Sequence, residues 1–118
     1  MNVADFSDDI GGDLDAISGD FIFREEAVDT APQVLSRAMP TYPWWAEKSG
    51  KEGFVVFRLK LNVQGRIEKL WVEQSTPTGV FDEAAEKAIR QYRFSPAIYK
   101  GNPVPVICKQ KIVFQLGG

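Results

Sequence analysis

The sequence predicts a small α+β fold: a three-stranded antiparallel sheet with two helices on one face, in the order α-β-β-α-β. Three observations lead to this prediction. Residues 54–63 alternate in polarity as a strand does, residues 81–92 carry apolar side chains at helical spacing, and the apolar-rich stretch 104–116 closes the chain. The chain has 118 residues and 44% hydrophobic content, which is enough apolar material for one core.

An acidic segment, residues 1–31, precedes a basic body. This segment holds nine acidic residues and one basic residue, whereas residues 32–118 hold seven acidic and thirteen basic residues. It is rich in Asp and Gly without a sustained period, so we predict a flexible leader at 1–31 and a folded domain at 32–118. Within the leader, "FIFREEAV" is compatible with a short strand, a helical turn, or docking of its phenylalanines on the body.

A short helix is predicted at 44–48. Pro40 and Pro43 disfavour helix for the residue before each of them, so the chain is extended up to Pro43, which then opens the helix. Gly50 is placed to end it in a left-handed conformation. The two adjacent tryptophans of this helix lie about 100° apart around its axis. We therefore expect one to pack under the hairpin and the other to lie at the rim.

A hairpin is predicted next. The strand at 54–63 has one uniformly apolar face, and the Gln-Gly pair at 64–65 is suited to a tight turn. The apolar residues of the returning strand do not keep a strict period of two. A bulge at 68–69 would bring its later apolar residues back to the core face.

The second helix and the last strand complete the domain. Apolar residues at helical spacing predict a helix at 81–92, which Ser95 and Pro96 end. The last strand is expected to direct Cys108, Ile112, Phe114 and Leu116 toward the core. Pro105 has no N–H group, so we expect this strand to lie on a sheet edge, at least at its start.

The composition argues against an enzyme or a metal protein. The chain has no histidine, and its one cysteine, Cys108, has no metal-binding neighbours at ligand spacing. No phosphate-binding loop or nucleophile motif is present, so we predict no catalytic residue, no metal and no cofactor. No apolar run approaches the roughly 18–20 residues that span a bilayer, and the acidic start does not fit a signal peptide. We expect a soluble chain without a membrane anchor of its own.

The chain from about Pro32 to Leu116 resembles the C-terminal domain of TonB, the periplasmic energy transducer of Gram-negative bacteria. The order and spacing of the pieces carry the resemblance more than any single piece does. Tyr92 stands where the family usually has tryptophan, and the acidic leader replaces a proline-rich spacer. The matching pieces are "PTYP", "GKEGFVVFRLKLNVQGRIEKLWVEQS", "FDEAAEKAIRQYRFSPA" and "GNPV…KIVFQL".

The resemblance implies a function in energy transduction. Proteins of this family connect the ExbB–ExbD motor of the inner membrane to outer-membrane transporters of iron siderophores, haem or vitamin B12. They bind the TonB box, a short extended segment near the N-terminus of the transporter, by adding it as a strand beside their own last strand. The resemblance thus implies a periplasmic domain whose full-length protein is anchored in the inner membrane.

Two segments are the candidate partner-binding site. An edge strand offers unpaired N–H and C=O groups, so its backbone can template a partner strand with little demand on sequence. By resemblance, the "PTYP" segment runs beside the bound box, with Met39 where relatives often carry a polar residue. The candidates are Met39, Pro40, Tyr42, Pro43, Ile107, Lys109, Lys111, Val113 and Gln115.

Other readings stay open at this stage. The aromatic rings around Tyr42 are also compatible with a purely structural clamp on the short helix, and "YRFSPA" with a core plug and helix stop. A TolA-like domain that links envelope layers is the alternative function, although "YRFSPA" disfavours it. A nucleic-acid module is disfavoured by dispersed basic residues and the acidic leader. The open edge is compatible with a monomer or a weak strand-exchanged dimer.

Overall fold

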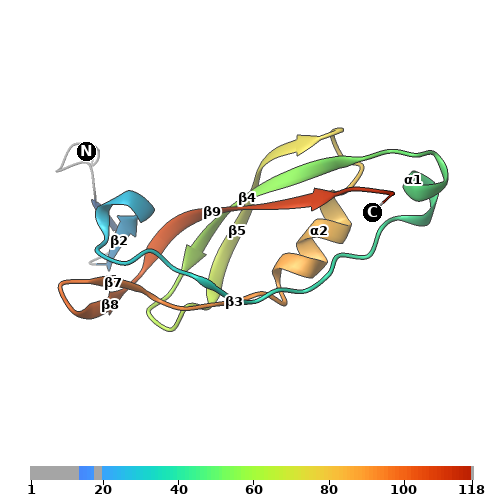
Figure 1. Ribbon diagram of the computed structural model, residues 1–118. Coiled ribbons are helices and arrows are strands. Elements are labelled where there is room, and N and C mark those ends of the chain that lie inside the picture. The colour runs from blue at the N-terminus through green and yellow to red at the C-terminus, as the bar shows by residue number, and fades with distance from the viewer. Residues whose placement is uncertain (1–13, 18–19, 118) are drawn as a thin grey trace.

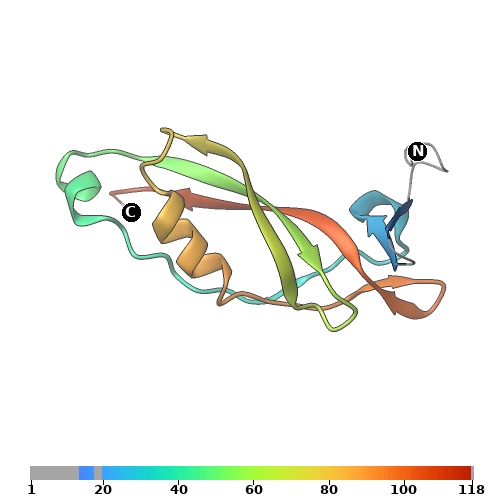
Figure 2. The ribbon, with the colours of Figure 1, turned by 180° about the vertical axis from the view of Figure 1, so that it is seen from behind.

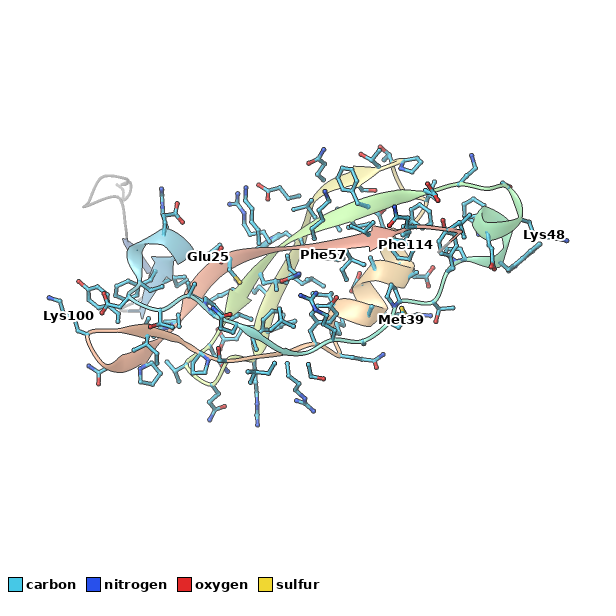
Figure 3. The ribbon with its side chains drawn as sticks, viewed as in Figure 1. Glu25, Met39, Lys48, Phe57, Lys100 and Phe114 are labelled. Carbon is cyan, nitrogen blue, oxygen red and sulfur yellow. The ribbon has the colours of Figure 1, made fainter. Side chains whose placement is uncertain are left out.

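The structure is a computed structural model that describes residues 14–17 and 20–117, with side chains from Ile22 onward. The molecule is elongated, and Lys48 and Lys100 mark its two ends (Figure 3). The elements in chain order are β1 (Leu14–Ile17), β2 (Asp20–Arg24), the 3-10 helix η1 (Glu25–Ala27), β3 (Val34–Ser36), α1 (Trp44–Lys48), β4 (Gly53–Leu61), β5 (Ile67–Thr76), α2 (Asp82–Ile89), β6 (Arg93–Phe94), β7 (Ala97–Tyr99), β8 (Asn102–Val104) and β9 (Val106–Phe114).

The main sheet has five strands in the order β1-β2-β9-β4-β5 (Figure 1). The three predicted strands are present as β4, β5 and β9, and both of their pairings are antiparallel. The prediction of a three-stranded, wholly antiparallel sheet was wrong, because β1 and β2 extend it and β2 pairs with β9 in parallel. These strands come from the segment predicted as a leader. In its "FIFR" stretch Ile22 is buried, which offsets part of the cost of ordering that segment.

The β4–β5 hairpin confirms the predicted turn and the position of the bulge, but of the later apolar residues only Leu70 packs against the core, since Val72 is 45% exposed. Gly65 has a φ of +80°, and its N–H donates to the Asn62 carbonyl at 2.9 Å. The Asn62 side chain accepts bonds from two further turn N–H groups, those of Gln64 and Arg66. The ladder register shifts at Glu68, within the predicted bulge, and shifts a second time at Glu73. The hairpin turn is thus held by backbone geometry and one asparagine.

The core lies between one face of the sheet and α2 (Figure 2). Phe81, at the start of α2, stacks on Phe114 of β9 with ring centroids 4.3 Å apart. Phe57 of β4 is fully buried beside them, and burying such a ring stabilises the fold by roughly 1.5–3 kcal/mol. The helix is shorter than predicted, since it ends at Ile89 and residues up to Tyr92 continue as turns.

The first helix does not cover the sheet as predicted. Both views place α1 at one end of the molecule, whereas α2 lies against the sheet (Figures 1 and 2). α1 has five residues and buries one of them, Ala46. Trp44 and Trp45 are 70% and 43% exposed, so the expectation that one of them packs under the hairpin was also wrong. Pro43 and Gly50 bound the helix as predicted, with Gly50 at a φ of +70°.

Two small sheets tie the rest of the chain to the body. β3 pairs with β6, and β7 pairs with β8, both antiparallel. Thr30 and Ile98 exchange two backbone hydrogen bonds of 3.0 Å, and the Asp29 carboxylate accepts the Lys100 N–H at 2.6 Å. The described part of the predicted leader is therefore attached to the domain from Asp20 onward. Residues 1–13 and 18–19 of the predicted leader lie outside the described residues.

Candidate functional site

Strand β9 has two neighbours of very different length. On one side, all nine residues of β9 pair with β4. On the other side, β2 pairs only at the start, where Phe23 faces Val106 and Arg24 faces Ile107. Among the described residues, no strand pairs with this side of β9 beyond Ile107. The second half of β9 is therefore an open edge.

The prediction of an edge at the start of this strand was wrong. The Phe23 N–H donates to the Pro105 carbonyl at 3.0 Å, so β2 covers that position. A proline lacks only the donor of its peptide unit, and its carbonyl still accepts. Pro105 can therefore begin a parallel ladder, although it could not stand in the middle of one.

This hydrogen bond also fixes which peptide groups of β9 point outward. N–H and C=O groups of successive strand residues alternate between the two sides of the strand. Because the Pro105 carbonyl points toward β2 and the β4–β9 register has no shift, the odd-numbered residues direct their peptide groups to the same side. The open edge is thus formed by Lys109, Lys111 and Val113, with Gln115 just beyond the strand end.

The side chains of β9 separate into two faces. The even-numbered Cys108, Ile112 and Phe114 point into the core and are at most 5% exposed. Burial raises the pKa of the Cys108 thiol to about 12, so this thiol is protonated and inert at neutral pH. Lys109, Lys111 and Val113 are exposed on the opposite face. The even-numbered residues thus anchor the strand in the core through their side chains. The odd-numbered residues carry the outward peptide groups.

The lysines of the edge are partly engaged on the outer face of the sheet. Lys109 lies 3.4 Å from Glu73 of β5, which also pairs with Arg58 at 2.9 Å. The hydrogen bond from Arg58, with Lys109 nearby, lowers the pKa of the Glu73 carboxyl. The Lys111 ammonium lies 4.5 Å from the centre of the Phe54 ring. Each of the two lysines therefore already has a partner on the outer face of the sheet, Glu73 for Lys109 and the Phe54 ring for Lys111.

The "PTYP" segment flanks the open end of β9. At the end of the molecule that carries α1, both views place β9 between β4 and residues 37–43 (Figures 1 and 2). The Tyr42 ring packs edge-on against Phe114 and Phe81, with centroids 5.7 and 5.5 Å apart. Its hydroxyl donates to the Lys51 carbonyl. Tyr42 thus joins this segment to both the core and the chain that enters β4.

Partial burial, with Glu52 and Glu47 nearby, raises the pKa of the Tyr42 hydroxyl. It therefore remains a hydrogen-bond donor at neutral pH. Met39 is 92% exposed and lies on the segment that passes α2 (Figure 3). Pro40 and Pro43 are half-buried, and the Pro43 carbonyl accepts the N–H groups of Ala46 and Glu47 in α1. The structure thus places Met39, Pro40, Tyr42 and Pro43 on one short segment beside the strand that carries the other candidates.

Sequence analysis missed two features of this region. The first is β2, which covers Ile107 and so separates this candidate from the open edge. The apolar-rich "FIFR" was its signal, but a short strand is ambiguous without its partner. The second is Glu52, whose carboxylate accepts the Leu116 N–H at 2.8 Å and holds the end of the chain beside β4. No sequence pattern marks that contact. Among the described residues, no group of acidic and cysteine side chains is arranged to hold a metal ion.

Comparison with known proteins identifies the family. The model of the family described as "Gram-negative bacterial TonB protein C-terminal" matches residues 38–116. The chain belongs to this family. Protein TonB of Vibrio cholerae is 37% identical over 91 residues, which cover 77% of this chain and 37% of that protein. Protein TonB of Yersinia enterocolitica is 30% identical over 92 residues, covering 78% and 34% respectively. The TonB family consists of energy transducers and not of enzymes.

The TonB fold is seen in a solved structure as well. The solution structure of the Pseudomonas aeruginosa TonB C-terminal domain superposes with a TM-score of 0.62 at 24% identity, covering 89% of this chain and 96% of that one. The likeness confirms a mixed α+β fold of TonB type. The chain spans little more than a third of the length of the two TonB relatives. Within the described residues, no helix has the length and apolar character needed to cross a bilayer.

Proposed function

We propose that this chain is the periplasmic domain of a TonB-type energy transducer, which binds the TonB box of outer-membrane transporters by β-strand addition. In this role it transmits energy from the proton-motive force to the uptake of iron siderophores, haem or vitamin B12. Family membership supports the transducer role, and the open half of β9 is the single observation that supports strand addition. The remaining partners in the proposal are the ExbB–ExbD motor and an inner-membrane anchor elsewhere in the full-length protein.

The open edge has the right chemistry for a partner strand. An exposed row of N–H and C=O groups pairs with any extended segment, so main-chain bonds supply affinity while the partner sequence can vary. One transducer that serves several transporters needs such tolerance. The proposed contacts are the peptide groups of Lys109, Lys111, Val113 and Gln115. Ile107 joins them only when β2 is displaced, because Arg24 already faces it.

The same geometry suits a domain that is pulled. A strand added along β9 is held by several main-chain bonds, and a force along the strand loads them together. The inward side chains of β9, Phe114 among them, lie in the core. The side of β9 opposite the open edge pairs with β4 along nine residues. Force on the added strand would therefore pass directly into the best-packed part of the domain.

The "PTYP" segment supplies side-chain contacts in this proposal. Tyr42 is already packed against Phe114, which fixes its position before any partner arrives. Met39 offers an exposed, flexible apolar side chain, so it contacts apolar atoms of the box. Lys109 and Lys111 steer an acidic box on approach. Their effect on affinity is small at physiological salt, because exposed ion pairs contribute about 0–1 kcal/mol.

An NMR titration tests this function. The ¹⁵N-labelled chain is titrated with a synthetic TonB-box peptide, and a scrambled peptide of the same composition is the control. We expect saturable shifts along Lys109–Gln115 and around Tyr42 with the box peptide only. Shifts at Tyr42 without β9 would move the site to the entry of α1. No shift at millimolar peptide would contradict the function and favour a TolA-like envelope linker with other partners.

A further inference from the structure

A cleft on another part of the molecule is lined by several arginine residues. It has a volume of about 430 Å³ and lies between the β4–β5 turn and the chain that follows α2. Neither β9 nor the segment 39–43 contributes to it, so it is separate from the proposed strand-addition site. The residues that line the cleft are Gln64, Gly65, Arg66, Ile67, Arg90, Tyr92, Arg93 and Phe94.

Close packing of the turn brings two chain segments together here. A Cβ atom on Gly65 would lie 2.2 Å from the Phe94 carbonyl oxygen, so only glycine allows the turn to approach β6 this closely. Asn62 accepts the Arg66 N–H at 3.0 Å and fixes the residue that follows the glycine. Arg93, next to Phe94 in β6, lines the same cleft. The positions of Arg66 and Arg93 are thus set by backbone packing.

The cleft has more positive than negative charge. Arg90 donates two bonds to Glu86, at 3.1 and 2.9 Å, so this pair is neutral as a unit. None of the ion pairs found among the described residues involves Arg66 or Arg93. A further guanidinium, that of Arg37, lies 5.9 Å from the centre of the Tyr92 ring, and Tyr92 lines the cleft. Two guanidinium groups that line the cleft, those of Arg66 and Arg93, therefore have no carboxylate partner in the described part of the chain.

We propose that this cleft binds a phosphate group, as a phosphomonoester dianion. Planar guanidinium groups donate paired hydrogen bonds in a geometry that matches phosphate oxygens, and arginine is the usual residue for such recognition. A carboxylate is matched by one arginine, as the Arg90–Glu86 pair already illustrates. A phosphate dianion has three terminal oxygens. It can accept bonds from Arg66 and Arg93 together and neutralise both.

Arginine side-chain NMR tests the proposal on the complete chain. Inorganic phosphate is titrated at constant ionic strength with chloride, and the Nε–Hε signals are followed. We expect saturable shifts of Arg66 and Arg93. The double variant R66Q/R93Q is expected to lower phosphate affinity about tenfold or more, because charge-assisted bonds to the anion are lost.

Arg58→Gln is the matched control. Arg58 is an exposed arginine of the outer sheet face that pairs with Glu73, so its loss should change phosphate affinity by less than about twofold. Shifts that do not saturate, or an equal loss of affinity in Arg58→Gln and in R66Q/R93Q, would overturn the proposal. Unfolding midpoints of the variants show whether each one is folded.

Two further arms identify the source of the phosphate. Glycerol 3-phosphate represents a soluble phosphomonoester, and vesicles of phosphatidylcholine with phosphatidic acid represent a lipid headgroup. Binding to glycerol 3-phosphate that R66Q/R93Q abolishes would support a soluble ligand. Co-sedimentation with phosphatidic acid vesicles that the same variant abolishes would support a lipid. Absence of binding in both arms would contradict the proposal.

Discussion

The two halves of β9 share one strand but have different outer neighbours. In the first half, β2 pairs with Val106 and Ile107, and the Phe23 N–H bonds to the Pro105 carbonyl. In the second half, from Lys109 on, the same side of the strand has no partner strand among the described residues. On the opposite side of the strand the two halves have the same neighbour, since β4 pairs with β9 along its whole length.

The comparison shows how one strand can both stabilise the domain and offer a surface for a partner strand. In the second half of β9, the core side chains and the β4-facing peptide groups belong to even-numbered residues, and the outward peptide groups to odd-numbered ones. Stability and partner binding can therefore change independently along the sequence. The parallel pairing with β2 also shows that this edge accepts a strand running in the direction of β9.

The largest expected effect, on the free energy of unfolding, comes from removing a core side chain from the open half of β9. Phe114→Ala removes a ring that stacks on Phe81 and contacts Tyr42. We expect the free energy of unfolding to fall by about 3–5 kcal/mol, as for other buried rings. Val113→Thr, one residue away on the outer face, should change it by less than about 0.5 kcal/mol. Urea unfolding followed by tryptophan fluorescence measures both, and similar losses would contradict the two-sided description.

A proline on the outer side should separate binding from stability. Val113→Pro removes one outward N–H while leaving the peptide groups that face β4, and edge strands tolerate such prolines. We expect TonB-box peptide affinity to fall about tenfold or more. Calorimetric titration measures this, with Val113→Thr as the control that keeps the N–H. Unchanged affinity in Val113→Pro would remove Val113 from the proposed contacts.

The covered half can be opened by a smaller change. Phe23→Pro removes the N–H that bonds to the Pro105 carbonyl, whereas Phe23→Ala removes only the ring that packs on Tyr99. We expect amide hydrogen exchange at Ile107 to quicken about tenfold or more in Phe23→Pro relative to Phe23→Ala, because β2 loses its hold. The amide of Ile112, which faces β4, should not change. Equal exchange at Ile107 in the two variants would mean that β2 does not protect it.

The smallest effect concerns the buried thiol between the two halves. Burial raises the pKa of Cys108 from 9.0 to about 12. The protonated thiol therefore contributes stability that is fully present below pH 9 and is lost as the pH rises toward 12. Urea unfolding over this range should show a steeper alkaline loss in the wild type than in Cys108→Ala. If the free energy of unfolding fell equally with pH in both proteins, the claim that burial keeps the thiol protonated would be contradicted.

Much of the central fold could be predicted from sequence because its signals are local. Alternating polarity predicted β4, helical spacing of apolar residues predicted α2, and a glycine predicted the turn at Gly65. Each of these signals lies within a short stretch of sequence. The pairing of β2 with β9 could not be predicted, because it joins residues more than 80 positions apart and the pairing segment is short. The place of α1 was missed for a related reason, since five residues do not specify what they pack against.

The candidate site was predicted unevenly for the same physical reasons. The parity of residues along β9 follows from strand geometry once the strand is recognised, so Lys109, Lys111 and Val113 were found together. Which half of the strand is open depends on β2, and Pro105 suggested the opposite half. The nearness of Tyr42 to β9 came from family resemblance, since no pattern in the sequence shows that two distant segments meet.

Hydrogen exchange of β9 with and without a TonB-box peptide tests strand addition most directly. In the free chain, the amides of Cys108, Gln110 and Ile112 should be protected by β4, and those of Lys109, Lys111 and Val113 should exchange quickly. We predict that the peptide protects the odd-numbered amides and leaves the even-numbered ones unchanged. Binding without any alternating protection along Lys109–Val113 would show that the partner is held elsewhere and would contradict the central claim.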